Sequence, residues 1–141
     1  MSKRLLLDSG PLGMIAHPKA NNDINHWFQV MLSRGVEFCI PEICDYELRR
    51  ELLHRRLIKS VQRLDELKNY ATYLPISTAA MLMAATFWAA SRKQGRLAAD
   101  PKELNGDVIL AAQAVEADGI VVTDNVGHLN LFVDAKRWTD I

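Results

Sequence analysis

The sequence predicts an α/β fold built on a central, mostly parallel sheet. Short apolar runs at residues 5–7 and 120–122 have the composition of strands that are buried on both faces. Longer amphipathic or alanine-rich segments lie between such runs, and the two kinds of segment alternate along the chain. The chain has 141 residues, of which 49% are hydrophobic, so it has the usual size of one domain and can bury a core. We therefore expect a single domain over residues 1–141.

The first half of the chain predicts two strands and three helices. Residues 5–7, LLL, form a continuous apolar run that ends at the turn-forming sequence DSGP. Residues 22–33 carry apolar side chains at helical spacing, and a glycine shortly after them suits a helix end. Residues 36–40, VEFCI, favour a second strand, and the proline that follows opens a helix over residues 41–57. A further helix is expected over about residues 60–70.

The second half predicts two more helices and two more strands around a polar loop. Residues 73–76 favour a short strand, and a hydroxyl residue after them can cap a buried helix at residues 78–94. Residues 95–106 are polar and contain a proline, which favours a loop. An alanine-rich helix is expected at residues 107–117, and the β-branched run at 120–122 follows it as a buried strand.

The predicted order is β-α-β-α-α-β-α-α-β, with one more short strand or edge within residues 131–141. Alternation of this kind predicts helices on both faces of a parallel sheet. The sequence contains no internal repeat, low-complexity tract or interdomain linker.

The charge balance narrows the function classes. Lys plus Arg and Asp plus Glu number 17 each, which excludes a globally basic nucleic-acid-binding protein but is compatible with a local basic surface. One segment is strongly biased, because residues 48–64 hold six basic side chains against one acid. The six are Arg49, Arg50, Arg55, Arg56, Lys59 and Arg63. They could contact RNA phosphates, bind an acidic partner, or form a solvated helix face.

The two cysteines, Cys39 and Cys44, are not in a CxxC pair and lie in or next to apolar sequence. We interpret them as reduced core thiols. The apolar run near the N-terminus is too short for a signal peptide, and no run is long enough to span a membrane. We therefore expect a cytoplasmic protein.

Acids follow the two strands that best fit a parallel sheet. Asp8 comes directly after the first strand, and Asp124 follows residues 120–122 with only Thr123 between. If those strands are neighbours, both carboxylates face the crevice at the carboxyl ends of the strands. Two carboxylates held close together repel, and a divalent cation relieves the repulsion. Oxygen ligands without a His/Cys cluster indicate Mg²⁺ or Mn²⁺ rather than zinc. Alternatively, each acid is a turn or capping residue.

Further acids lie on the predicted helices. Glu47 sits beside an apolar stripe, where a carboxylate is costly unless it is paired or bound to a metal. The alternative for Glu47 is a salt bridge with Arg50. Asp107, taken alone, could be a helix N-cap. Glu42 and Asp45 are interpreted as solvated acids of a first helical turn, where the helix dipole favours them.

Several segments resemble the motifs of PIN domains. LLLDSGPLGMIAH resembles the first motif, a hydrophobic strand followed by Asp, a small hydroxyl residue and a helix start. IPEICDYELRREL resembles the second, which carries a helical glutamate, and LNGDVILAAQAVEADGIVVTDN resembles the third and fourth run together. The resemblance spans essentially the whole chain, and the most similar group is the VapC-like toxins of toxin–antitoxin pairs. It implies a PIN-like three-layer α/β/α domain.

The resemblance also implies the site residues. Asp8 matches the first metal-binding acid, Glu47 the helical glutamate and Asp107 the third acid. The fourth position is either Asp124 or Asn125, and Asp124 is also a candidate catalytic acid. Two further residues have open roles: Asp100 is an outer carboxylate or a loop residue, and Ser9 contacts metal or phosphate or caps a helix.

The implied reaction is hydrolysis of RNA phosphodiester bonds, assisted by one or two Mg²⁺ or Mn²⁺ ions. Ser9, Arg49 and Arg50 would contact the substrate. The four histidines, His17, His26, His54 and His128, are interpreted as surface or loop residues, of which His17 and His128 could at most contact substrate.

The partners implied by the resemblance are RNA, a cognate antitoxin protein and a second copy of the chain, with no membrane. Trp27, Phe28 and Met31 are candidates for the dimer surface, although core packing is their more usual role. The alternative function is a catalytically weak or inactive PIN-fold module that binds RNA or another protein.

Overall fold

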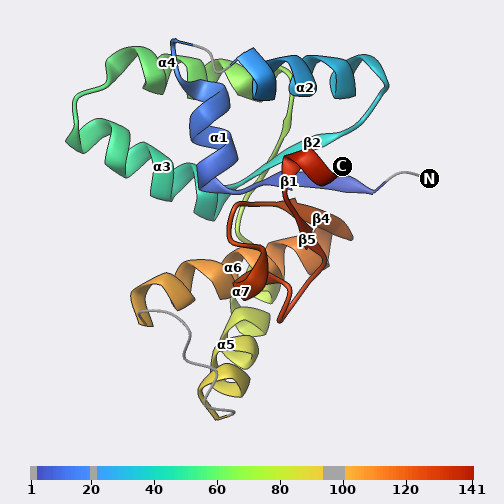
Figure 1. Ribbon diagram of the computed structural model, residues 1–141. Helices are drawn as coiled ribbons and strands as arrows, with labels where there is room; N and C mark the ends of the chain where they lie inside the picture. The colour runs from blue at the N-terminus through green and yellow to red at the C-terminus, as the bar shows by residue number, and fades with distance from the viewer. Residues whose placement is uncertain (1–2, 20–21, 94–100) are drawn as a thin grey trace.

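The computed structural model describes residues 3–19, 22–93 and 101–141 (Figure 1). Its core is a five-stranded sheet in the order β3-β2-β1-β4-β5, in which every neighbouring pair is parallel. The strands are β1 (Arg4–Leu7), β2 (Phe38–Pro41), β3 (Thr72–Leu74), β4 (Gly119–Val122) and β5 (Ala135–Lys136). The predicted α/β fold with a parallel sheet is confirmed, including the short last strand.

Helices cover both faces of this sheet. Helices α1–α4 lie on one side of it and α5–α7 on the other (Figure 1). The helices are α1 (Ser9–Ala16), α2 (Asn22–Ser33), α3 (Glu42–His54), α4 (Ile58–Glu66), α5 (Thr78–Lys93), α6 (Pro101–Ala117) and α7 (Val126–Leu129). Two 3₁₀ turns are η1 (Leu67–Asn69) and η2 (Trp138–Asp140).

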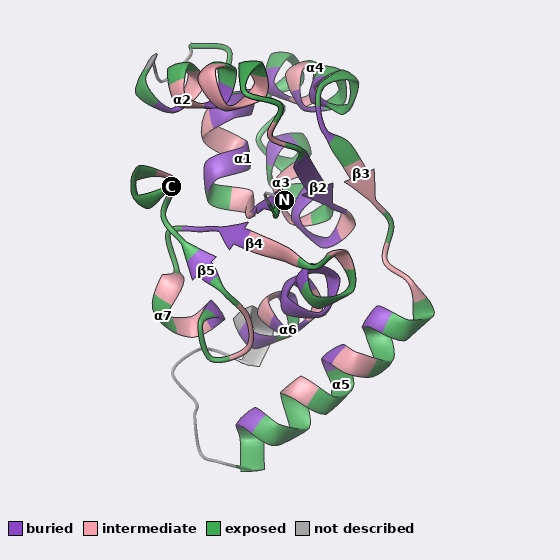
Figure 2. Cartoon of the chain, turned by 90° about the vertical axis from the view of Figure 1, so that its right-hand side faces the viewer, coloured by how far each residue is buried: buried purple, intermediate pink, exposed green. Residues whose placement is uncertain are grey.

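The central strand β1 explains the apolar run at the start of the chain. β1 lies between β2 and β4 and has helices on both faces, so Leu5, Leu6 and Leu7 are all buried. Figure 2 shows the burial of its neighbour β4, whose carboxyl-terminal half is buried. Leu7 pairs with Val122 of β4. The residues that follow the two strands therefore emerge side by side at the carboxyl edge of the sheet, the edge where α/β proteins bind ligands.

The local sequence pattern predicted only a turn after β1, whereas the resemblance to the first PIN motif implied a helix start there, and helix α1 confirms the helix start. The helix forms because Asp8 is its N-cap and accepts a hydrogen bond from the Ser9 amide. Pro11 lies in the first turn, where the missing N–H costs nothing. Leu12 and Ile15 then pack into the core. Tertiary packing thus outweighs two glycines in a short segment.

Helix α6 begins earlier than predicted. It starts at Pro101, a favourable residue for a first helical position, so residues 101–106 are helical and the predicted loop is wrong there. Residues 95–100 of that loop lie outside the described residues. Asp107 consequently lies within α6, and the interpretation of Asp107 as a helix N-cap is wrong as well.

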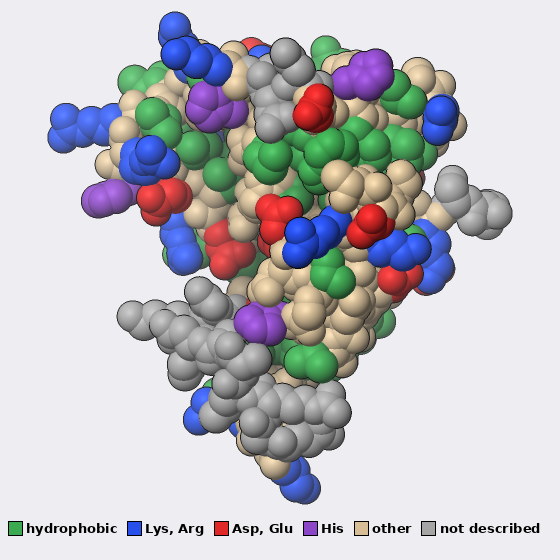
Figure 3. Space-filling model, viewed as in Figure 1, with side chains coloured by type: hydrophobic (Ala, Val, Ile, Leu, Met, Phe, Trp, Pro, Cys, Tyr) green, Lys and Arg blue, Asp and Glu red, His purple; other side chains and the backbone are tan. Residues whose placement is uncertain are grey.

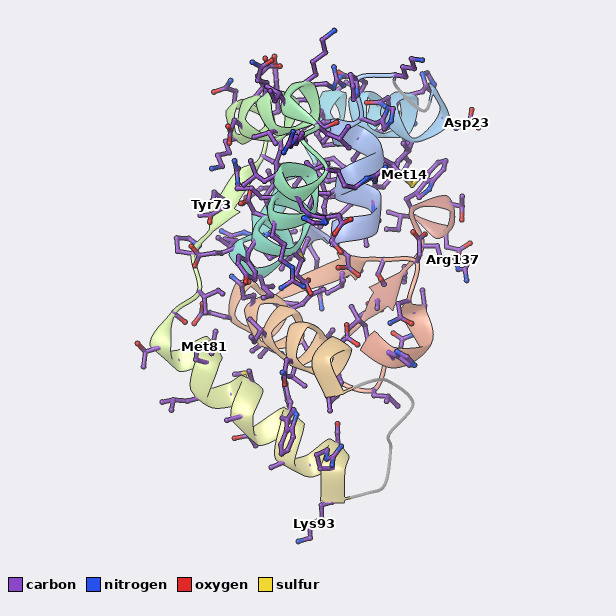
Figure 4. The ribbon with its side chains drawn as sticks, turned by 90° about the vertical axis from the view of Figure 1, so that its left-hand side faces the viewer. Met14, Asp23, Tyr73, Met81, Lys93 and Arg137 are labelled. Atoms are coloured by element: carbon purple, nitrogen blue, oxygen red, sulfur yellow. The ribbon has the colours of Figure 1, made fainter. Side chains whose placement is uncertain are left out.

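Helix α5 was predicted to be buried, and this too is wrong. Ala80 and Ala84 pack against α6, but Met81, Leu82 and Trp88 are exposed. Figure 4 labels Met81 near the start of this helix and Lys93 at its end. The apolar side chains of α5 therefore extend beyond the face that packs against α6.

Both cysteines are buried and free, as predicted. Among the described residues, none of the helices has the length and apolar character needed to cross a membrane. On the face drawn in Figure 3, acidic and basic side chains are interspersed, in accord with a net charge of zero.

Candidate metal centre

The candidate site begins at the carboxyl edge of β1 and β4. Asp8 directly follows β1, and its backbone amide donates to the Val122 carbonyl at 3.0 Å. One carboxylate oxygen, Oδ1, accepts from the Ser9 amide at 2.7 Å, and the other, Oδ2, accepts from the Thr123 hydroxyl at 2.7 Å. The Asp8 carboxylate is therefore oriented by the protein itself.

Helix α3 brings two more ligand-bearing side chains to Asp8. Cys44 and Glu47 are three residues apart, so they lie on the same face of the helix. One ligand atom from each of Asp8, Cys44 and Glu47 can be chosen so that all lie within 4.8 Å of one another. The Cys44 thiol is buried and donates to Asp8 Oδ1 at 3.7 Å. We call these three residues the Asp8 cluster.

The electrostatics of the Asp8 cluster favour a bound cation. The pKa of Glu47 is raised, first by burial and then by the negative charges of Asp8 and Asp107, while Arg50 opposes the shift. The pKa of Cys44 is raised well above its ordinary value by burial, and further by Asp8 and Glu47. The thiol is thus a neutral hydrogen-bond donor, and the carboxylates carry repulsion that a divalent cation would relieve.

Helix α6 brings Asp107 toward the same region. A β-carbon placed on the neighbouring Gly106 would lie 2.5 Å from Glu47 Oε2, which shows how closely α6 approaches α3. His128 of α7 has its Nδ1 3.9 Å from Asp107 Oδ2. The same His128 nitrogen lies 2.9 Å from the side-chain nitrogen of Asn125. Asp8 and Asp107, two of the acids singled out from the sequence, thus both act electrostatically on Glu47, the third.

The fourth position stays unassigned. Asp124 is exposed, and its Oδ2 lies 3.0 Å from where a β-carbon of Gly10 would be, so it sits against the start of α1. It does not belong to the Asp8 cluster in the described part of the chain. Asn125 is exposed and donates its backbone N–H to the Thr123 hydroxyl at 2.9 Å. Asp100 lies outside the described residues.

Ser9 is half-buried, and its hydroxyl lies 3.5 Å from Asp8 Oδ1. This long contact places the hydroxyl beside the acid. The interpretation of Ser9 as the capping residue is wrong, because the N-cap of α1 is Asp8. A metal or phosphate contact of Ser9 stays a prediction.

The two candidate arginines differ in their environment. Arg49 donates to Asp45 at 2.9 Å and to Asp65 at 2.7 Å. Asp45 is only 6% exposed, so its interpretation as a solvated acid is wrong. Arg50 is exposed, and its guanidinium lies over the Tyr46 ring, 5.0 Å from the ring centroid.

Glu42 was also interpreted as solvated, and the structure corrects this. Its carboxylate accepts from the Tyr73 hydroxyl at 3.0 Å and from the Ile76 amide at 2.8 Å. Glu42 thus links α3 by hydrogen bonds to β3 and the segment after it. The interpretation of Glu42 as a solvated acid of the first turn is therefore wrong.

The three candidates for a dimer surface, Trp27, Phe28 and Met31, differ in how far they are buried. Phe28 is a core residue, whereas Trp27 and Met31 are half-buried and line a groove with Trp138 and Ile141. Trp27 packs edge-on against Phe38, with ring centroids 5.4 Å apart.

Sequence reasoning left several neighbours of the acids without a role. Cys44 was read as a core thiol, although its spacing from Glu47 already placed both on one helix face. Thr123 was treated as a spacer, and only the register of β1 against β4 shows that its hydroxyl meets Asp8. His128 was interpreted as a surface or loop residue that could at most contact substrate, and its Nδ1 lies 3.9 Å from Asp107 Oδ2. Gly106 gave no signal that could have revealed its contact with Glu47.

The sequence matches no family model, and no curated protein matches it in sequence. The fold, in contrast, is similar to several solved structures. A chain in the crystal structure of VapBC2 from Rickettsia felis, bound to a promoter DNA fragment, has a TM-score of 0.78 and 13% identity, covering 95% of this chain and 98% of that one. A chain of VapBC-1 from nontypeable Haemophilus influenzae has a TM-score of 0.73 and 16% identity, covering 96% and 98%. A chain of FitAcB from Neisseria gonorrhoeae has a TM-score of 0.66 and 19% identity, covering 97% and 99%.

Proposed function

We propose that this chain, whose fold is that of the PIN domain, is a metal-dependent endoribonuclease that hydrolyses RNA phosphodiester bonds as the toxin of a toxin–antitoxin pair. The observation that carries the proposal is the coupling of the acids. Glu47 lies with Asp8 in one cluster, and its pKa is raised by burial and by the charges of both Asp8 and Asp107. Carboxylates from three separate elements that repel one another at a strand edge are the arrangement that a divalent cation stabilises.

The donor set fits a hard cation. Asp8, Glu47 and Asp107 offer carboxylate oxygens, which Mg²⁺ and Mn²⁺ prefer. We propose these three acids as metal ligands and catalytic residues, with Asp124 and Asn125 as further ligands after β4. When bound, the cation would lower the pKa of a water molecule and offset charge on the phosphate.

The chain's own residues orient the reaction. Thr123 and the Ser9 amide hold the two oxygens of Asp8, so this carboxylate loses little freedom on binding. The N-terminus of α1 lies beside it and provides favourable potential for a phosphate group. We propose that Ser9 and Arg50 contact the RNA backbone there, and that Arg49 acts mainly by pairing with Asp45.

The proposed partners are suggested by the likeness to the VapBC and FitAcB structures. We propose that a cognate antitoxin covers the Asp8 cluster in the cytoplasm, and that the chain forms a homodimer. The groove lined by Trp27, Met31 and Trp138 has a volume of about 620 Å³ and is a candidate for such a contact. A small neighbouring open reading frame encoding a DNA-binding protein would support the antitoxin; a genome without one would count against it.

RNA cleavage tests the enzymatic proposal. Purified protein is incubated with RNA and Mg²⁺ or Mn²⁺, and the intact chain is compared with Asp8→Asn and Glu47→Gln. Asp134→Asn is the matched control, because Asp134 is an exposed carboxylate after α7 and away from the Asp8 cluster. We expect cleavage by the intact chain and the control, and loss in the two site variants and with EDTA. Cleavage that survives both site substitutions would refute the site.

A second candidate function is an inactive PIN-fold module that binds RNA or protein. The exposed position of Asp124, outside the Asp8 cluster, is the observation that favours it. RNA binding by the intact protein without any metal-dependent cleavage would support this candidate against the nuclease.

A further inference from the structure

We propose that Cys44 converts the Asp8 cluster into a site for a thiophilic divalent cation of the Zn²⁺ class, bound by Asp8, Cys44 and Glu47. This inference deepens the proposed function, because it concerns the metal selectivity of the same site. It follows from the donor atoms of this chain, and it can be tested without RNA.

The positions of the donor atoms suit such a cation. A tetrahedral ion with a metal–sulfur distance of about 2.3 Å and a metal–oxygen distance of about 2.1 Å places the two ligand atoms roughly 3.6 Å apart. Cys44 Sγ lies 3.7 Å from Asp8 Oδ1. The carboxylate of Glu47 contributes the third donor of a set whose members all lie within 4.8 Å of one another. Only small side-chain movements are needed to bind an ion among the three.

The supports of these donors are rigid. Cys44 and Glu47 lie one turn apart on α3, and the residues around Cys44 are buried. Asp8 is held by the Ser9 amide and the Thr123 hydroxyl. Asp8 and Cys44, which are held in place, and the Glu47 carboxylate on the same helix match the ligand number of a catalytic zinc site, in which three protein ligands leave one position open.

The chemistry of sulfur makes the cluster selective. Mg²⁺ takes oxygen ligands and gains nothing from a thiol, so a hard ion leaves Cys44 as the hydrogen-bond donor of Asp8. A softer ion forms a bond to Cys44 sulfur, and the thiol proton passes to solvent without any change of oxidation state. Because Asp8 and Glu47 serve both kinds of ion, the two compete for one site.

The test uses Cd²⁺ as a spectroscopic probe on the metal-free, full-length protein. Cd²⁺ bound to a thiolate absorbs in the ultraviolet, and isothermal titration gives its affinity. Cys44→Ser is compared with Cys39→Ser, a matched control because Cys39 is equally buried but lies on β2 beside Glu37. We expect one thiolate band in the intact chain and in the control, and neither the band nor tight binding in Cys44→Ser. The Cd²⁺ affinity of Cys44→Ser should fall roughly 100-fold, whereas Cys39→Ser should bind Cd²⁺ as the intact chain does.

A second variant keeps the test valid if Cys44→Ser does not fold. Asp8→Asn keeps the thiol and a good helix N-cap, and it should weaken Cd²⁺ binding at least about tenfold. Unchanged Cd²⁺ affinity in Cys44→Ser, or a band that depends on Cys39, would overturn the inference. Cd²⁺ binding through Cys44 in a protein that cleaves no RNA would refute the ribonuclease and leave the metal selectivity standing. RNA cleavage by a protein whose Cd²⁺ binding does not depend on Cys44 would refute the metal selectivity and leave the ribonuclease standing.

Discussion

Gly106→Ala separates the stability of the fold from the geometry of the metal site. Gly106 lies inside α6 and is buried, and the added β-carbon would meet Glu47 Oε2 at 2.5 Å. Ordinary contact begins near 3.4 Å, so the carboxylate oxygen must retreat by 3.4 − 2.5, about 0.9 Å. The obstructed atom is the far end of a flexible side chain, so Glu47 can yield without moving the helix.

The two energetic consequences of this substitution have opposite signs. Alanine is favoured over glycine inside a helix by about 1 kcal/mol. Driving a side chain off its rotamer costs about 0.5–1.5 kcal/mol. The free energy of unfolding should therefore change by less than about 1 kcal/mol. Metal affinity and RNA cleavage should nevertheless fall on the order of 10–100-fold, because a ligand has moved by nearly an ångström.

Three measurements check this prediction: urea unfolding of the metal-free protein, Mn²⁺ binding by isothermal titration, and RNA cleavage. Gly127→Ala is the matched control, since a β-carbon there meets nothing within 4 Å. A Gly106→Ala protein that is as stable as the control and binds Mn²⁺ with unchanged affinity would refute the role assigned to Glu47.

Three further predictions concern side chains around the site. The pKa of Glu47 is raised by burial and neighbouring charge, so the folded state holds its proton to higher pH than the unfolded chain does, and stability falls as pH rises from about 4.5 toward the folded-state pKa. Glu47→Gln should therefore stabilise the metal-free protein at neutral pH, an advantage that urea titrations should find gone below that window. Thr123→Val removes the 2.7 Å hydrogen bond to Asp8. It should lower the free energy of unfolding by about 1–2 kcal/mol and weaken Mn²⁺ binding. Arg49→Met leaves Asp45 buried without its partner and should cost about 1–3 kcal/mol of stability, whereas Arg50→Ala should leave stability unchanged and lower RNA affinity with a shallower salt dependence.

Each of these has a control within the chain. Thr123→Ser keeps the hydroxyl and should retain most of the Mn²⁺ affinity, so equal losses in the serine and valine variants would contradict the hydrogen-bond argument. A lower stability of Glu47→Gln at neutral pH would show that Glu47 is stabilised by its surroundings. RNA affinity that falls equally in the Arg49 and Arg50 variants would show that both contact the substrate.

The central part of the fold could be predicted because its pattern is local. Residues 5–7 and 120–122 are short continuous apolar runs next to turn-forming residues, and this combination favours a strand buried on both faces. Helix α1 could not be predicted in this way, because its glycines and proline indicate a turn locally. It forms only because Leu12 and Ile15 reach the core once the sheet exists. The start of α6 was missed for a related reason, since Pro101 serves equally in a loop and at a helix start.

The candidate site likewise contains residues that the local sequence indicates and residues that depend on long-range contacts. Asp8 and Glu47 could be singled out as candidates only as members of a set: an acid directly after a strand and a helical acid beside an apolar stripe, followed by further acids in the order of the PIN motifs. The contribution of Thr123 depends on Leu7 pairing with Val122, a register that no local pattern contains.

The hydrogen bond between Asp8 and Thr123 joins residues 115 positions apart. During translation, Asp8 and Glu47 leave the ribosome well before Asp107 and before Thr123, whose hydroxyl orients Asp8. A partly synthesised chain thus carries the acids but lacks the assembled centre until β4 emerges and pairs with β1. The Thr123 hydrogen bond to Asp8 can therefore form only after β4 has been synthesised and has paired with β1.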